Sequence, residues 1–192
     1  MKISTNVKSL AGAVTAAMLF LTQSVGAATI YGDDMSGFYG PGLVNYVAAK
    51  GNFPAIVIDN PFGPQTDSAL LAGLELPGYY PATKLKATTV KARDDGHLVL
   101  VFNPRRTANG DTTCAAPAKQ SASGTVGAPG TLRLQAAFCY DDEMVSEAIM
   151  EMPRPAGIND PAFDQAMVQL MEVLLPGENQ YLIGGCVTPG TC

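Results

Sequence analysis

The residues of this chain whose type and spacing suggest chemistry most directly are its four cysteines, Cys114, Cys139, Cys186 and Cys192. No Cys-x-x-Cys motif occurs and the chain has a single histidine, so neither a zinc site nor a thioredoxin-like redox pair is predicted. An even number of cysteines favours disulfides, and four cysteines permit three pairings. Closeness in the sequence favours Cys114–Cys139 and Cys186–Cys192, because Pro189-Gly190 can turn the intervening residues of the second pair back on themselves.

Acid–base chemistry has few candidates. His97 is the only histidine, and it follows Asp94-Asp95-Gly96, a turn signal that predicts an exposed hairpin end. Catalysis there would need a nucleophile and an orienting carboxylate from elsewhere, and no Gly-x-Ser-x-Gly motif is present. We therefore predict no catalytic residue.

Acidic residues cluster at Asp33-Asp34, Asp94-Asp95 and Asp141-Asp142-Glu143. Calcium needs six or more converging oxygens, and no Asp-x-Asp-x-Asp loop occurs, so we interpret these clusters as solvated turns. A pair of carboxylates for glycoside cleavage depends on spacing that exists only in the fold. A secreted hydrolase that uses acidic residues is therefore the alternative to a non-catalytic protein.

Methionine is abundant late in the chain. Met144, Met150 and Met152 are candidate thioether ligands for Cu(I). The competing interpretation is core packing, which Met167 and Met171 favour because they share the apolar face of a predicted helix. We favour packing and predict no metal and no cofactor.

Three aromatic side chains lie at predicted turns: Phe62 in Asn60-Pro61-Phe62-Gly63, and the pair Tyr79 and Tyr80 after a predicted helix. Exposed aromatics at rigid turns can contact a protein partner or a glycan. The alternative is that they fold back over the edge of the core. The sequence leaves this choice open.

Residues 1–28 have the layout of a cleaved secretory signal peptide. Lys2 and Lys8 precede an apolar run over 10–21, and small residues end the segment at Val25-Gly26-Ala27-Ala28. The run is shorter than the ~20 residues that span a bilayer, and no lipidation cysteine follows it. We expect a periplasmic or secreted protein.

The composition limits the classes of molecule that this protein can be expected to bind. The formal net charge is −5, and cleavage of the signal peptide would make it more negative. An acidic chain is repelled by phosphate backbones, so nucleic-acid binding is excluded. No later apolar stretch predicts a transmembrane helix.

The predicted elements begin with an irregular segment over 29–54 that contains one short helix over 41–50. A single domain over 55–176 follows, with a buried strand at 55–58 and a helix from Thr66 or Asp67 to Pro77-Gly78. Strands 85–92 and 97–102 are predicted to pair as a hairpin. A long, flexible loop covers 105–130.

Two strands, 132–138 and 145–152, come next. The last helix is predicted from its cap, Asp160, from Pro161 and from apolar residues at a 3.6-residue period up to Leu174. The tail 177–192 is predicted to be closed by the second disulfide. This order favours an α+β fold, with a largely antiparallel sheet, helices packed on one face and stabilising disulfides.

The chain shares a pattern of short motifs with a known group of proteins. The pattern consists of Asn60-Pro61-Phe62-Gly63, Phe102-Asn103-Pro104, Cys114, Ala137-Phe138-Cys139 and a helix before Leu174-Leu175-Pro176. The chain resembles a group of small exported or lipid-anchored bacterial proteins that have no known activity. The resemblance covers about residues 55–176 and implies that Cys114 and Cys139 are partners. It implies no activity.

The sequence thus predicts an exported, non-catalytic binding or envelope-interaction domain. Its partner is expected to be an envelope protein, a glycan or a small molecule.

Overall fold

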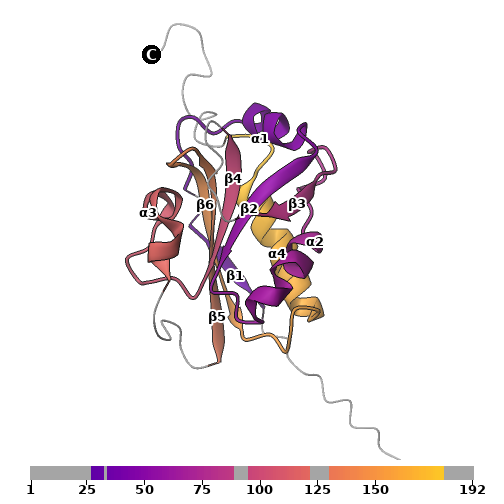
Figure 1. The fold of residues 1–192 in the computed structure, drawn as a ribbon, viewed down its shortest axis with the longest axis vertical. Helices are drawn as coiled ribbons and strands as arrows, with labels where there is room; N and C mark the ends of the chain where they lie inside the picture. The colour runs from indigo at the N-terminus through magenta and orange to yellow at the C-terminus, as the bar shows by residue number, and fades with distance from the viewer. Residues whose placement is uncertain (1–26, 33, 89–94, 122–129, 180–192) are drawn as a thin grey trace, which may run out of the picture.

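The computed structural model describes residues 27–32, 34–88, 95–121 and 130–179 (Figure 1). Six strands form one sheet in the order β1-β6-β5-β4-β2-β3. The strands are β1 (Thr29–Tyr31), β2 (Asn52–Ile58), β3 (Lys84–Ala87), β4 (Gly96–Phe102), β5 (Thr131–Tyr140) and β6 (Glu143–Pro153).

The central strands of the sheet are buried on both faces. Every residue of β4 is buried, as the unbroken apolar run of this strand predicts. On β5, Leu132, Leu134 and Phe138 face one core, whereas Cys139 faces a second, smaller cluster on the other side. The sheet therefore needs cover on two faces.

The sheet is mixed, so the prediction of a largely antiparallel sheet is wrong. The β1–β6, β6–β5 and β5–β4 pairs are antiparallel, and β2 pairs in parallel with both β4 and β3. The predicted hairpin of 85–92 with 97–102 does not form, because β2 lies between β3 and β4 in the sheet. The two apolar strands β2 and β4 pair with each other in the interior of the sheet, and β3 pairs with the outer edge of β2.

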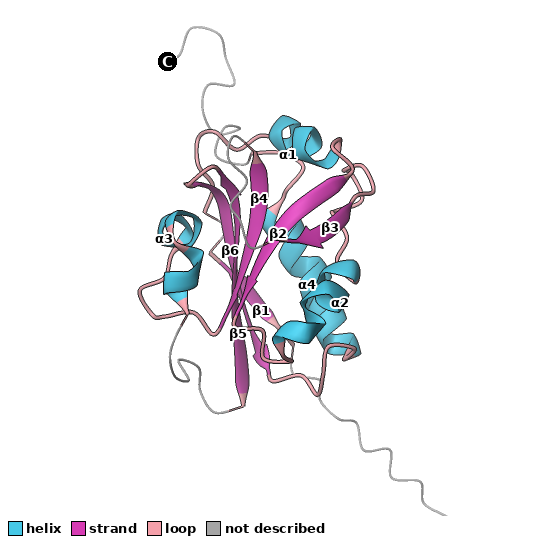
Figure 2. Ribbon diagram, viewed as in Figure 1, coloured by secondary structure: helices cyan, strands magenta, loops and turns pink. Residues whose placement is uncertain are grey.

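Three helices, α1 (Pro41–Ala48), α2 (Asp67–Ala72) and α4 (Pro161–Leu174), pack on the face that carries the main core (Figure 2). Helix α4 forms as the sequence predicts. The Asp160 side chain accepts a hydrogen bond from the backbone N–H of Ala162 (3.0 Å), and Pro161 occupies the first turn. Helix α2 is shorter than predicted and gives way at Gly73.

One further helix, α3 (Gly110–Ala115), lies against the opposite face of the sheet, beside the turn η2 (Pro117–Gln120) (Figure 2). The helices therefore do not all pack on one face, and 105–130 is not a featureless loop over its described part. Asn109 and Thr112 form a reciprocal capping box that starts the helix. The predicted disulfide Cys114–Cys139 is present and fastens α3 to β5, with 5.6 Å between the two Cα atoms.

The N-terminal region is more ordered than predicted, because the segment 29–54 contains β1, α1 and the start of β2. No helix within the described residues is both long and apolar enough to cross a membrane. Most of the predicted signal peptide, residues 1–26, and the second predicted disulfide, Cys186–Cys192, lie outside the described residues.

Candidate functional site

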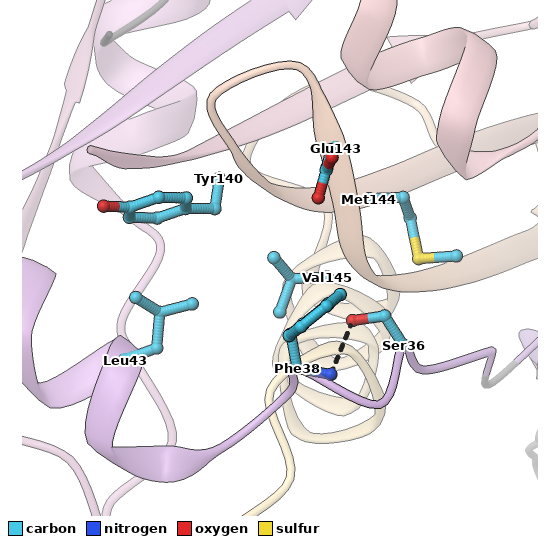
Figure 3. Close-up of a pocket in the computed structure, with 7 residues that line it drawn as sticks. All are labelled: Ser36, Phe38, Leu43, Tyr140, Glu143, Met144 and Val145. Atoms are coloured by element: carbon cyan, nitrogen blue, oxygen red, sulfur yellow. Dashed lines mark hydrogen bonds between the residues drawn. The ribbon is translucent and has the colours of Figure 1, made fainter. Parts of the chain in front are cut away.

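An apolar pocket opens where the chain enters α1 and where β5 turns into β6 (Figure 3). Its volume is about 280 Å³. The lining residues come from the turn before α1, from α1 itself and from the facing ends of β5 and β6: Ser36, Phe38, Leu43, Tyr140, Glu143, Met144 and Val145. A cavity of this size accepts one bulky side chain or a small apolar group.

Phe38 is the most exposed large apolar side chain of the described residues, with 82% of its surface open to solvent. Tyr140 on the opposite side of the pocket is 37% exposed. An isolated exposed aromatic is ordinary, but two aromatics beside an apolar hollow form a surface typical of a binding site.

The turn that carries Phe38 is held in place by several hydrogen bonds. The backbone N–H of Ser36 donates to the carbonyl of Val145 (2.9 Å), which docks the turn on β6. The backbone N–H of Tyr39 donates to the Ser36 carbonyl (3.0 Å), and the backbone N–H of Phe38 donates to Ser36 Oγ (3.3 Å; Figure 3). The side-chain amide of Asn179 donates to the carbonyl of Tyr39 (3.0 Å). Phe38 is thus presented by a fixed turn, which lowers the entropy lost on binding.

The neighbouring Tyr39 points inward and anchors this region. Its hydroxyl donates to the carbonyl of Pro176 (2.5 Å) and lies 3.1 Å from the hydroxyl of Tyr80. Burial, together with the hydrogen bond to Tyr80, raises the pKa of Tyr39 far above its ordinary value. This phenol is therefore neutral at physiological pH and acts as a structural anchor.

His97 does not lie at an exposed hairpin end. It is the second residue of β4, its side chain is 0% exposed, and its register partner on β5 is Cys139. Because residues of directly paired positions share a face, His97 lies on the side of the sheet that α3 covers. It is not among the residues that line the apolar pocket.

Glu147 on β6 is the second buried ionisable residue of note, with 6% of its surface exposed. Its carboxylate accepts hydrogen bonds from the backbone N–H of Gly110 (2.6 Å) and from Nε2 of Gln135 (2.6 Å). Burial raises the pKa of Glu147, and these two hydrogen bonds oppose that shift. The carboxyl group joins the start of α3 to the sheet.

The side-chain amide of Gln135 can bind Glu147 in two orientations. Its Oε1 is buried and has no hydrogen-bond partner among the described residues, whereas its Nε2 donates to Glu147. Rotation of the amide by 180° would present Oε1 as an acceptor instead. The pair can therefore accommodate either a carboxylate or a protonated carboxyl at Glu147.

The three methionines proposed as Cu(I) ligands are not brought together. Met150 and Met152 are buried in the main core, together with Met167 and Met171 of α4. Met144 packs against the smaller cluster on the other face and lines the apolar pocket. The placement of Met150 and Met152 is that of side chains that fill a core.

The three aromatic residues considered as partner contacts make intramolecular contacts. Phe62 stacks edge-on against Phe163 of α4, with 5.4 Å between ring centroids. The hydroxyls of Tyr79 and Tyr80 donate to the carbonyls of Leu175 (2.7 Å) and Pro176 (2.8 Å), after the end of α4. The Tyr79 ring remains exposed, so a further contact through that ring stays a prediction.

Asp141 and Asp142 form the tight connection between β5 and β6, with Asp141 at a φ of 55°, and Glu143 of the same acidic cluster begins β6. Among the residues that the structure describes, no three His, Cys, Asp or Glu side chains are grouped closely enough to hold a metal ion. Asp33 and Asp94 lie outside the described part of the chain.

The residues of the apolar pocket escaped the sequence analysis except for Met144 and Glu143, which were considered for other chemistry. The available signal was Phe38 in a glycine-rich stretch, between Gly37 and Gly40, where a ring has little local structure to cover it. Comparison of the chain with family models, with curated proteins and with solved structures finds no match in any of the three.

Proposed function

We propose that this protein is an exported, non-catalytic binding domain that takes an apolar group of its partner into the pocket between Phe38 and Tyr140. The observation that carries the proposal is the fixed, outward orientation of Phe38 beside that pocket. A folded protein gains nothing in stability from an aromatic ring held in water, so the arrangement favours contact with another molecule.

Export is supported by the signal-peptide pattern of residues 1–28 and agrees with the disulfide Cys114–Cys139. Disulfides persist in oxidising compartments and are rare in the cytosol. Expression of the full chain in a bacterium, followed by fractionation and N-terminal sequencing, tests this part. A mature protein that keeps Met1 and stays in the cytosol would contradict it.

The alternative, a secreted hydrolase, is favoured by one observation: the pKa of Glu147 is raised by burial, as in a general acid. However, both oxygens of this carboxyl group accept hydrogen bonds within the protein, from Gly110 and from Gln135. A general acid must reach its substrate, and the arrangement of Glu147 supports a structural task in positioning α3 instead.

The binding proposal is tested by NMR titration of the mature protein with toluene, a small neutral apolar probe. We expect amide shift changes confined to residues 36–43 and 140–145, and their loss in Phe38→Ser. Val168→Ser removes another exposed apolar side chain, on α4, and should leave the titration unchanged. Shift changes that are absent, or equal in wild type and Phe38→Ser, would refute the proposed site.

A further inference from the structure

We infer that the occupant of the Phe38–Tyr140 pocket is a polypeptide segment of a partner protein that presents an apolar side chain next to an arginine or lysine. This inference rests on the proposed function and adds the chemical class of the partner. It combines the size of the pocket, the charge at its rim and a contact of the same kind inside the protein.

The size of the pocket favours a single side chain over a whole small-molecule ligand. Sites that enclose such ligands typically occupy about 300–1,000 Å³, whereas this pocket measures about 280 Å³. Figure 3 shows the space framed by Leu43, Tyr140, Phe38 and Val145. One apolar side chain can fill this space while its own backbone passes over the rim.

The charge at the rim favours a cationic neighbour for that side chain. Glu143 lines the pocket, Asp141 lies exposed in the adjoining turn, and none of the described lining residues is basic. The exposed ring of Phe38 adds to this preference, because arginine and lysine bind favourably over aromatic faces. A cation beside the buried apolar group would therefore contact a carboxylate and a ring at once.

The protein already binds one of its own lysines in this way. The Nζ atom of Lys50 lies 4.2 Å from the centroid of the Tyr46 ring and 2.8 Å from Oδ2 of Asp95. Tyr46 follows Leu43, a pocket residue, by one turn of α1. The same combination of an aromatic ring and a carboxylate is offered to a partner by Phe38 and Glu143.

Two other occupants fit the rim less well. A second copy of this chain, packed symmetrically, would bring one acidic turn against another, since a two-fold contact pairs the same patch on both subunits. Anionic lipid headgroups would meet the carboxylate of Glu143 and be repelled. Both serve as outcomes of the test.

The chain contains no tryptophan, so a peptide with one tryptophan can be followed selectively by its fluorescence. The probes are three blocked pentapeptides: Gly-Arg-Trp-Arg-Gly, the neutral Gly-Gln-Trp-Gln-Gly and the charge-reversed Gly-Glu-Trp-Glu-Gly. We expect the arginine peptide to bind at least tenfold more tightly than the glutamate peptide at low ionic strength. The difference should shrink at 0.5 M salt, because exposed charges are then screened.

Two charge-reversal variants separate a local effect from net charge. Glu143→Lys should weaken the arginine peptide at least fivefold and strengthen the glutamate peptide. Asp164→Lys makes the same change of net charge on the first turn of α4 and should leave both affinities within twofold of wild type. Equal effects of the two variants would overturn the inference.

The remaining outcomes separate this inference from the proposed function. Equal binding of all three peptides, or toluene binding without peptide binding, would overturn the partner class and leave the apolar pocket as a binding site. Binding of phosphatidylglycerol vesicles, or a dimer that Phe38→Ser dissociates, would also overturn the partner class. If toluene fails as well, the proposed function fails with it.

Discussion

Gly110→Ala is the substitution whose effect follows most directly from the geometry of α3. Gly110 is buried at the first position of this helix, and its N–H donates to Oε2 of Glu147 (2.6 Å). A Cβ atom at this position would lie 2.8 Å from the same oxygen and would collide with Cγ of Met144. Alanine therefore forces both Met144 and the Glu147 carboxylate to move, or the helix itself.

Either response costs free energy. Overpacking of a well-packed site costs about 1–3 kcal/mol, and a shift of α3 that relieves the collision leaves a buried oxygen of Glu147 without its hydrogen bond, at a cost of about 1–3 kcal/mol. Alanine also lowers the conformational entropy of the unfolded chain, which stabilises the folded protein by about 0.4–1 kcal/mol. We expect Gly110→Ala to lower the free energy of unfolding by up to about 2.5 kcal/mol.

Urea unfolding of the oxidised protein, followed by far-UV circular dichroism, measures this change. The matched control is Gly42→Ala in α1, where an added Cβ meets nothing within 4 Å. The control should stabilise the protein by about 0.4–1 kcal/mol through the unfolded state. If both alanine variants were stabilised alike, α3 would not be packed against Glu147 and Met144 as described.

Two more predictions concern the same helix and its anchors. Replacement of both Cys114 and Cys139 by alanine should lower the free energy of unfolding by about 3.5 kcal/mol, the value of the chain-entropy model for a sequence separation of 25. Urea unfolding measures this loss. Hydrogen exchange of the variant should show the amides of α3 opening before those of β4. Because burial raises the pKa of Glu147, its contribution to stability is fully present below its ordinary value of 4.5 and is lost as the pH rises through the folded-state pKa. Glu147→Gln should therefore flatten the fall in stability above pH 4.5, and parallel urea-unfolding curves for wild type and variant between pH 4.5 and 8 would refute this assignment.

The sequence predicted those elements whose signals are local. Helix α4 carries its cap, its first-turn proline and its apolar period in consecutive residues, and the structure confirms it. Strand β4 is an apolar run, and it is buried on both faces as predicted. These signals depend on neighbouring residues alone, so they survive without knowledge of the fold.

The pairing of the strands could not be predicted from the sequence, because it depends on contacts between segments that are far apart in the chain. The turn signal at Asp95-Gly96 favoured a hairpin, but β4 pairs with β2 and with β5 instead. The apolar pocket was not predicted for a similar reason. Phe38 and Tyr140 are 102 positions apart and become neighbours only when the turn before α1 docks on β6. The amino-acid composition cannot predict a tertiary contact of this kind.

Helix α3 was missed because its own sequence favours a helix only weakly. The segment Gly-Asp-Thr-Thr-Cys-Ala contains β-branched and glycine residues of low helix propensity, and six residues are too few for a stable isolated helix. The only local signal was the capping pair of Asn109 with Thr112.

The sheet nevertheless requires cover at the position of α3. Alternation along β4, β5 and β6 places His97, Gln135 and Glu147 on the face opposite the main core, and all three are buried. Within the described part of the chain, the apolar cluster on that face is small, with six buried members against thirty in the main core. Packing alone therefore holds this helix weakly. The disulfide Cys114–Cys139 and the hydrogen bond from Gly110 to Glu147 add to the weak packing of α3. Removal of both should therefore free α3 while the sheet and α4 stay folded.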